Sequence, residues 1–241
     1  MAFGSGLPTL PRQLAEQHAL RRLVRDEGID LVHVNGARDH RFVMQGMLGM
    51  RRPPIILTKH NSKPTRTLGN AFRARWATDR VIAVSAHTGR LLEQGPYRRC
   101  PIDVVRNGVD LDRFAPLPAD AGQAMRQQWT QDPDALLLVS NAGTDDYKGW
   151  IDLAQAIALL PDAIRPHIHM AVAGHLPNAQ QRAQVQVLGD VATQVHFTGL
   201  LADTRPLIAA GDVGFVLSND IETISFACRE MMASARPPKP A

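Results

Sequence analysis

A lysine at position 148 lies at the start of a helix that the sequence predicts over residues 148–160. It follows a buried strand predicted at 135–140 and the segment GTDDYKG at 143–149. The first N–H groups of a helix are unpaired and partly positive, so a phosphate is favoured there, and an ammonium group adds to the attraction. The lysine precedes the second glycine, unlike the lysine of a phosphate-binding P-loop. An anion site is one interpretation, and an exposed lysine in the first helical turn is the other.

Two glutamates, Glu222 and Glu230, lie at the last predicted helix, eight positions apart. In an α-helix that spacing is a rise of roughly 12 Å with a rotation of roughly 80°. Carboxylates so far apart do not act on one carbon as an acid–base pair. They suit the two ends of an elongated ligand whose phosphates face the helix N-terminus. Two solvated helix glutamates are the alternative interpretation.

The cysteines and histidines predict no metal site. Cys100 and Cys228 match no zinc or redox spacing. His167 and His169 alternate on one face of a predicted strand, but no third ligand has a suitable spacing, so ordinary strand histidines are preferred. Gly4 and Gly6 have no preceding strand and no correctly placed third glycine, which argues against a nicotinamide dinucleotide as cofactor.

A predicted helix near residues 65–78 carries an apolar stripe at i, i+4 and i+8, formed by Leu68, Phe72 and Trp76. Three arginines lie beside the stripe in the sequence (Arg66, Arg73 and Arg75). A basic amphipathic helix of this kind can rest on an anionic membrane. A stripe that faces the protein core, with solvated arginines, is the preferred interpretation.

The composition is typical of a soluble globular protein, with 44% hydrophobic and 21% charged residues among 241. Only four of the 27 basic residues are lysines, the arginines are spread along the chain, and the net charge is +4. This pattern indicates a GC-rich genome and predicts no nucleic-acid partner. No apolar run reaches the roughly 18 residues of a membrane-spanning helix. The N-terminus lacks the features of a secretory signal, so we predict a cytoplasmic protein.

Short apolar runs alternate with amphipathic stretches along the whole chain, which predicts an α/β protein with parallel sheets covered on both faces. A proline-marked linker at 116–118 divides the series into two Rossmann-like domains, residues 1–116 and 117–241. In such sheets ligands bind beyond the carboxyl ends of the strands. The expected strands are residues 29–34, 55–60, 80–85, 102–105, 135–140, 167–174, 194–199 and 213–218.

Read together, the motifs resemble those of the family-four retaining glycosyltransferases of the GT-B fold, which assemble bacterial lipopolysaccharides and polysaccharides from sugar nucleotides. The matching blocks occur in family order over nearly the whole chain. They are DLVHVNG (30–36), LTKHN (57–61), DRVIAVSAHTGRLL (79–92), VVRNGVDLDRFAP (104–116), YKGWIDLAQAIALL (147–160), VHFTGL (195–200) and ETISFACREMMA (222–233).

The resemblance implies a donor site in the C-terminal domain and an acceptor side in the N-terminal domain. Lys148 would neutralise the donor diphosphate, Glu230 would accept hydrogen bonds from the ribose, and Glu222 would contact the transferred sugar. His60 would project toward the reaction centre or the acceptor. Neither a protein nucleophile, nor a cofactor, nor an obligatory metal is implied. Backbone N–H groups of the last helix would support the phosphates (Thr223, Ile224 and Ser225).

Three departures from the family pattern bear on activity. Gly143 stands where the family usually has an arginine, so a bidentate phosphate partner is missing. Asp145 and Asp146 add negative charge beside the site. Both ends differ from the family pattern, and the ending MMASARPPKPA is what a wrong reading frame of a GC-rich gene would produce. We therefore expect a truncated or frameshifted chain that buries both sheets incompletely and exposes unpaired strand edges.

The function expected from these residues is transfer of a hexose- or heptose-type sugar from a nucleotide sugar to a lipopolysaccharide or other glycan acceptor, with retention. An inactive fragment of such an enzyme is the first alternative. Another Rossmann-like nucleotide-sugar enzyme is the second, disfavoured by the missing glycine fingerprint. A glycolipid acceptor also leaves open a peripheral contact with the inner face of the membrane.

Overall fold

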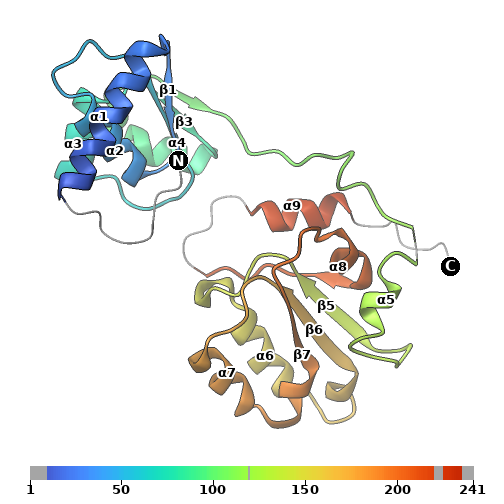
Figure 1. Cartoon of the computed structure of the whole chain (residues 1–241). Helices are drawn as coiled ribbons and strands as arrows, with labels where there is room; N and C mark the ends of the chain where they lie inside the picture. The colour runs from blue at the N-terminus through green and yellow to red at the C-terminus, as the bar shows by residue number, and fades with distance from the viewer. Residues whose placement is uncertain (1–9, 119, 220–224, 235–241) are drawn as a thin grey trace. The chain divides into compact units, whose positions relative to one another are not determined.

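The computed structural model describes residues 10–118, 120–219 and 225–234. It forms two compact units, Met1–Asn107 and Gly108–Ala241, which are described separately (Figure 1). The sequence predicts a boundary after residue 116, whereas the structure divides the chain after Asn107. The reason is packing: Phe114 is buried against Ile208 and Met231 in the core of the second unit.

The first unit contains a sheet of four parallel strands in the order β1-β2-β3-β4. Each strand is followed along the chain by a helical segment before the next strand begins, up to β4, as parallel pairing requires. The strands are β1 (Val32–Val34), β2 (Ile55–Lys59), β3 (Arg80–Ala83) and β4 (Ile102–Val104). The helices are α1 (Leu10–Asp26), α2 (Ala37–Gly46), α3 (Leu68–Trp76), α4 (Ala86–Glu93) and the 3₁₀ helix η1 (Pro96–Arg99).

Side-chain oxygens cap two helices of the first unit, α3 and α4. Ser85 Oγ accepts from the N–H of Thr88 at the start of α4, and Thr67 Oγ1 accepts from Asn70 at the start of α3. The core lies between the sheet and the helices, with Ile55 and Val81 fully buried. The remaining core residues include Val24, Val34, Val43, Met47, Leu57, Leu92 and Tyr97.

Helix α3 differs from the preferred prediction, because its apolar stripe does not face the core. Leu68, Phe72 and Trp76 are 83%, 60% and 58% exposed. The opposite side of the helix is the buried one, and it contains Arg73 and Ala77. The guanidinium of Arg73 donates to Asn70 Oδ1 at 2.6 Å within the same helix.

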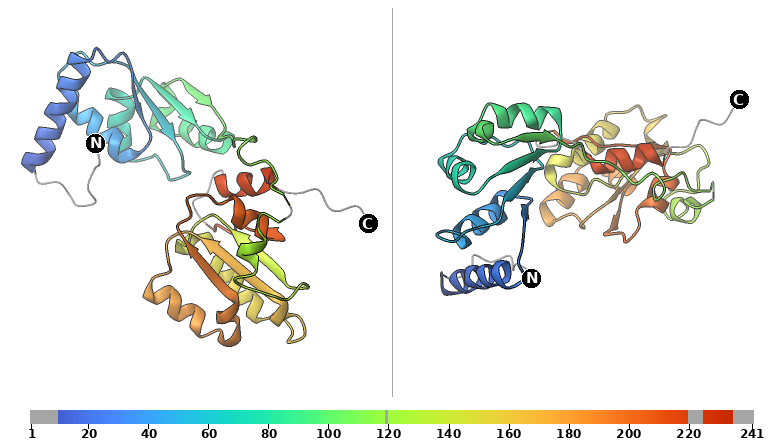
Figure 2. Two further views of the ribbon diagram at one scale, coloured as in Figure 1. Left: turned by 45° about the vertical axis from the view of Figure 1, so that its right-hand side comes forward. Right: turned by 90° about the horizontal axis from the view of Figure 1, so that it is seen from above.

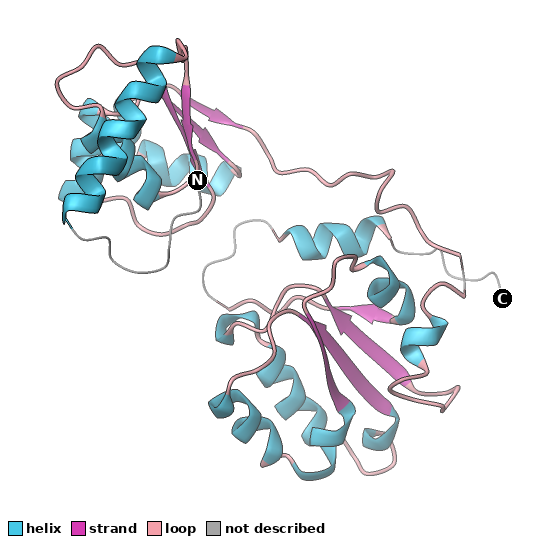
Figure 3. Cartoon of the chain, in the orientation of Figure 1, coloured by secondary structure: helices cyan, strands magenta, loops and turns pink. Residues whose placement is uncertain are grey.

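The second unit contains a four-stranded parallel sheet in the order β7-β6-β5-β8 (Figure 3). The chain adds strands outward from β5 through β6 to β7 and then returns to the other side of β5 to form β8. The strands are β5 (Leu136–Ser140), β6 (Ile168–Ala173), β7 (Val195–Gly199) and β8 (Val213–Gly214). Among the described residues, β8 has no strand on its outer edge.

Helices cover both faces of this sheet, because successive strand residues point to opposite sides. Met170 and Val172 of β6 pack with Trp150 of α6. Their neighbours Ala171 and Ala173 pack with Leu207 of α8 on the other face. The helices are α5 (Gln123–Arg126), α6 (Trp150–Ala158), α7 (Ala179–Gln186), α8 (Arg205–Ala210) and α9 (Phe226–Ala233). Three 3₁₀ helices are η2 (Asp146–Lys148), η3 (Arg165–His167) and η4 (Gly189–Gln194).

Both sheets are parallel and carry helices, as the sequence predicts for the α/β class. Figure 2 shows the alternation of strands and helices in each unit from two further directions. Within the described part of the chain, no helix is both long and apolar enough to cross a lipid bilayer.

Candidate functional site

The strand order of the second unit creates a switch point between β5 and β8. The next strand after β5 pairs on one side of it and β8 pairs on the other, so their carboxyl ends mark the position at which ligands bind in open α/β sheets. The loop after β5 runs from Asn141 to Gly149, and the segment after β8 continues to Asn219. Helix α9 lies beyond the end toward which the strand arrows point (Figure 3). The site is built from these three segments.

The turn with Lys148 is fixed against the segment that follows β8. Gly149 has a φ of +70°, and a Cβ there would lie 2.3 Å from the carbonyl oxygen of Leu217. The N–H of Asn219 donates to the carbonyl of Tyr147 at 3.1 Å. Lys148 therefore lies in a turn joined by its backbone to both strands of the switch point.

The lysine itself is half-buried, and its Nζ lies 4.9 Å from the centroid of the Tyr147 ring. It ends the 3₁₀ helix η2, and the α-helix begins only at Trp150, two positions later than predicted. The ring nitrogen of Trp150 donates to the carbonyl of Thr144 at 3.1 Å. This bond ties the start of α6 to the loop that precedes the lysine.

Gly143 shapes the loop after β5 and does not offer it a free donor. Its φ is +93°, and its N–H donates to the carbonyl of Ala173 at the end of β6, at 3.1 Å. The next residue of that neighbouring loop, Gly174, has a φ of +155°, and a Cβ on it would lie 2.7 Å from the Cα of Gly143. The two loops approach so closely that only glycine fits at position 174.

Glu230 comes to the same edge of the sheet from α9. Its Oε2 accepts a hydrogen bond of 2.5 Å from Nδ2 of Asn141, the first residue after β5. The other polar atom of that amide, Asn141 Oδ1, is buried and has no partner among the described residues. Asn141 is not predictable as a site residue from local sequence, because its partner lies 89 positions away. Its place directly after a predicted buried strand was the one available signal.

Ser225 acts as the N-cap of α9. Its Oγ accepts from the N–H of Cys228 at 3.2 Å, which satisfies one of the unpaired donors at the helix start. The other three predicted residues of this segment, Glu222, Thr223 and Ile224, lie outside the described residues. The structure thus places Lys148, Gly143 and Glu230 at the carboxyl end of the second sheet, and Ser225 caps helix α9.

His60 belongs to the first unit, where it follows β2 and is exposed. Its Nε2 lies 3.4 Å from Oδ1 of Asn35, which follows the adjacent strand β1. Lys59 donates from Nζ to Asn61 Oδ1 at 2.5 Å, and burial lowers the pKa of this lysine. The carboxyl end of the first sheet therefore gathers an imidazole, two amides and an ammonium group.

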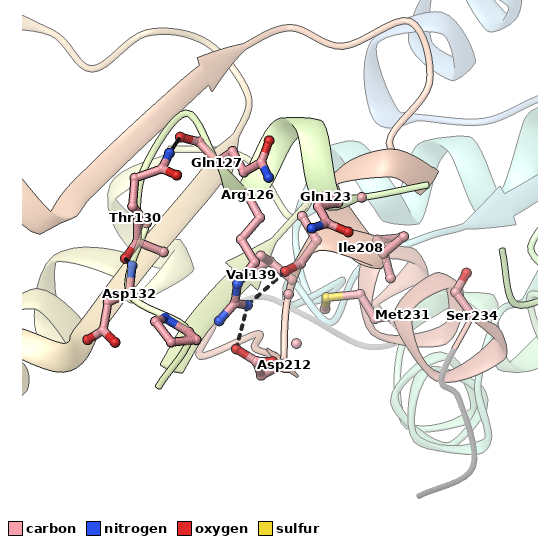
Figure 4. Close-up of a pocket in the computed structure, with 17 residues that line it drawn as sticks. Gln123, Arg126, Gln127, Thr130, Asp132, Val139, Ile208, Asp212, Met231 and Ser234 are labelled. Carbon is pink, nitrogen blue, oxygen red and sulfur yellow. Dashed lines mark hydrogen bonds and ion pairs between the residues drawn. The ribbon is translucent and has the colours of Figure 1, made fainter. Parts of the chain in front are cut away.

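A cavity of about 650 Å³ lies elsewhere in the second unit (Figure 4). It is lined by Arg126 and Asp212, which form an ion pair of 2.7 Å, and by residues of α5, α8 and α9. Asp212 also accepts from the N–H of Leu137 at 2.8 Å, so the cavity lies by the amino ends of β5 and β8. None of the predicted site residues lines it. Because ligands bind at the carboxyl ends of such sheets, we do not assign the donor to this cavity.

The two histidines predicted on one strand have partners within the protein, although His167 ends η3 and only His169 lies on β6. His167 Nδ1 lies 2.6 Å from Asp132 Oδ2, and His169 Nδ1 lies 3.1 Å from His196 Nε2 on β7. The His196 ring also stacks on Trp129. Among the described residues, no three His, Cys, Asp or Glu side chains come together as a metal site would require.

Two family models match the chain in sequence. Residues 1–113 match the model described as Glycosyltransferase Family 4, and residues 133–238 match the one described as Glycosyl transferases group 1. The two matches follow one another along the chain, so the chain carries two successive glycosyltransferase domains. No curated protein matches the chain significantly.

Solved structures of the GT-B fold are similar to the chain. HepE from Anabaena, crystallised with UDP, is 21% identical with a TM-score of 0.70, over 90% of this chain and 61% of HepE. Sucrose-phosphate synthase from Thermosynechococcus elongatus is 19% identical with a TM-score of 0.75, over 98% of this chain and 63% of the synthase. The α,α-trehalose 6-phosphate synthase from Burkholderia multivorans is 15% identical with a TM-score of 0.67, over 95% and 60%.

At these identities the likeness concerns the fold, and it confirms the predicted GT-B architecture. The chain spans about three fifths of the length of the structures that it matches.

Proposed function

We propose that the chain acts as a retaining glycosyltransferase that moves a hexose- or heptose-type sugar from a nucleotide sugar to a glycan or glycolipid acceptor of the lipopolysaccharide kind. The observation that carries the proposal is that the loop after β5 holds both the Lys148 turn, bonded to the segment after β8, and Asn141, bonded to Glu230. HepE of the same fold was crystallised with UDP and with UDP-glucose, which supports a nucleotide sugar as the donor.

The two ends of the site suit the two ends of a nucleoside diphosphate. Lys148 contributes a full positive charge, and the nearby start of α6 contributes the partial positive charge of a helix N-terminus. Both charges stabilise the diphosphate as it leaves. Glu230 Oε2 is already bonded to Asn141, so the second carboxylate oxygen accepts from the ribose hydroxyls. In the reaction the bond from the sugar C1 to the diphosphate breaks, a bond to the acceptor oxygen forms on the same face, and the acceptor proton passes to the departing phosphate.

The remaining roles follow the family resemblance. Glu222 contacts the transferred sugar, and the N–H groups of Thr223, Ile224 and Ser225 support the phosphates. His60 serves the acceptor side from the first unit. Gly143 provides no side chain toward the phosphates, so Lys148 is the principal cation of the donor site. We therefore expect the affinity for the donor to depend strongly on Lys148.

Partial ligands test the donor site, because each half of the site then has its own probe. We expect Lys148→Ala to weaken UDP and inorganic diphosphate about 10- to 100-fold and to leave uridine unchanged, since a charged hydrogen bond is worth about 1.5–3 kcal/mol. Glu230→Ala should weaken UDP and uridine by a similar factor and leave diphosphate unchanged. Isothermal titration calorimetry measures all six affinities.

Matched controls remove a charge from the exposed surface of the same unit. Arg182→Ala on α7 and Asp190→Asn on η4 are expected to bind all three ligands as the unmodified chain does. If Lys148→Ala and Glu230→Ala change no affinity, the site assignment is wrong. If the chain binds UDP but gives neither transfer nor hydrolysis of UDP-, GDP- or ADP-sugars, it is a nucleotide-binding protein without the proposed activity. Nuclear magnetic resonance of the product anomer tests retention.

A further inference from the structure

We propose that Gln181, on α7, is a positioning residue for the diphosphate half of the donor site. The inference rests on the proposed function, because that function assigns the diphosphate to the turn that carries Lys148. Gln181 acts through two groups of the loop after β5 that lie just before the lysine. They are the carbonyl of Thr144 and the carboxylate of Asp146.

The amide of Gln181 is buried, and three hydrogen bonds fix its orientation. The residue is 6% exposed. Its Nε2 donates to the carbonyl of Thr144 at 2.8 Å and to Oδ1 of Asp146 at 2.7 Å. Its Oε1 accepts from the N–H of Asn178 at 2.9 Å. A flipped amide would set its oxygen against two acceptors and its NH₂ group against a donor, so a single orientation satisfies all three partners.

Part of this arrangement is an ordinary helix start. Asn178 Oδ1 accepts from the N–H of Gln181 at 2.9 Å, and Gln181 returns the bond through Oε1, which completes the capping box of α7. A capping box needs only the side-chain oxygen, and a glutamate would provide it equally well. The Nε2 group does more, because both of its acceptors lie on another loop, 37 and 35 positions earlier in the chain.

The loop that Gln181 holds is also joined to the start of α6. The Thr144 carbonyl accepts a second hydrogen bond, from the ring nitrogen of Trp150 at 3.1 Å, and Thr144 Oγ1 donates to the carbonyl of His175 at 2.6 Å. Helices α6 and α7 lie side by side on one face of the sheet (Figure 1). The residues before Lys148 are therefore held by α7, as the residues around it are held by the segment that follows β8.

Asp146 is the group whose position matters most for an anionic ligand. It is an exposed residue two positions before Lys148, and a carboxylate that approaches a diphosphate repels it. The same carboxylate would also compete with the diphosphate for the ammonium group. The bond from Gln181 holds Oδ1 toward α7 and so limits both effects. An amide that donates therefore suits position 181, and a second carboxylate does not.

Removal of the amide tests this role. We expect Gln181→Met, which keeps a side chain of similar length, to weaken inorganic diphosphate and UDP about tenfold and to leave uridine unchanged. Isothermal titration calorimetry measures the three affinities. The matched control is Gln194→Met, because Gln194 is 8% exposed and donates to the carbonyls of Arg165 and Pro166, just before β6 begins. Urea denaturation should show a loss of stability in both variants, whereas diphosphate affinity should fall only in Gln181→Met.

An exchange of donor and acceptor tests whether Gln181 acts through Asp146. Q181E keeps the oxygen that caps α7 but sets a carboxylate against Asp146, so diphosphate affinity should fall at least about tenfold. Q181E/D146N restores one donor and one acceptor to the pair, and we expect its affinity to recover to within about threefold of the unmodified chain. Q181E/D145N has the same net charge but leaves two carboxylates facing each other, and it should remain weak.

Three results would overturn the role of Gln181. They are unchanged diphosphate affinity in Q181M, an equal loss of uridine affinity, and a recovery in Q181E/D145N as full as that in Q181E/D146N. None of them contradicts the proposed function. Diphosphate binding with the expected pattern among the variants, but without transfer from any nucleotide sugar, supports the role of Gln181 and contradicts the proposed function. An unmodified chain that binds neither diphosphate nor UDP overturns both.

Discussion

Asn141 controls the position of Glu230, and a single bond of 2.5 Å carries this role. The amide donates from Nδ2, while its buried Oδ1 stays without a partner in the described part of the chain. A buried acceptor without a donor is costly, so the bond that Nδ2 donates to Glu230 is the reason for an amide at this position. Asn141 is therefore a positioning residue for the proposed ribose contact.

The substitution Asn141→Asp tests this role with almost no change of shape. It replaces the donor with a second carboxylate beside Glu230, and two like charges at this distance repel each other. We expect UDP affinity at pH 8 to fall about tenfold, or about 1.4 kcal/mol, with inorganic diphosphate unaffected. Calorimetric titration of both ligands measures the effect.

The control for this substitution is Asn178→Asp. Asn178 caps α7 through its side-chain oxygen, which an aspartate provides equally well. We expect this variant to retain UDP affinity. A tenfold loss in both variants would show a general effect of added charge, and no loss in Asn141→Asp would remove Asn141 from the site.

At the scale of elements, the site depends on close backbone packing between the loop after β5 and the segment after β8. Gly149 is the contact point, since a Cβ there would meet the Leu217 carbonyl at 2.3 Å and the φ of +70° is unfavourable for other residues. We expect Gly149→Ala to lower the free energy of unfolding of the second unit by about 3 kcal/mol and to abolish UDP binding. Chemical denaturation and UDP titration measure the two effects.

Gly189 separates the two contributions at Gly149. Its φ is +62°, but a Cβ there would meet no atom within 4 Å. Gly189→Ala should therefore cost only the conformational penalty, about 1 kcal/mol, and leave UDP binding intact. If both variants lose the same stability, the contact with Leu217 does not contribute.

At the scale of the whole molecule, periodicity predicted the elements well and long-range contacts poorly. The alternation of apolar runs with amphipathic stretches predicted two parallel sheets, because each buried strand is short and continuous in sequence. The bond between Asn141 and Glu230 joins residues 89 positions apart, which no local pattern encodes. The period of α3 identified an apolar face, but the fold decided that Arg73 and Ala77 face inward and the stripe outward. The domain boundary differs for the same reason, because Phe114 finds its partners near the other end of the chain.

The stability of the second unit is expected to depend on pH through the stacked histidines of the sheet. Burial, and then the proximity of His169, lower the pKa of His196 to about 4 from an ordinary value of 6.5. Burial likewise lowers the pKa of His169, which Asp132 opposes and Arg126 reinforces. The unfolded chain therefore binds more protons than the folded chain at mildly acidic pH. The contribution of these neutral histidines to the free energy of unfolding is fully present above about pH 7. It declines as the pH falls from about 6.5 to about 4.

Replacement of His196 by phenylalanine tests this dependence, since it retains a ring to stack on Trp129 and removes the titrating group. We expect the unmodified unit to lose about 1–2 kcal/mol of unfolding free energy between pH 7 and pH 4.5 through His196, after allowance for solvent at the half-buried ring. His196→Phe should show a smaller loss by that amount. His175→Gln, at an exposed position after β6, should keep the original dependence. Urea denaturation followed by Trp129 fluorescence at both pH values measures the difference, and parallel curves for His196→Phe and the unmodified chain would contradict the assignment.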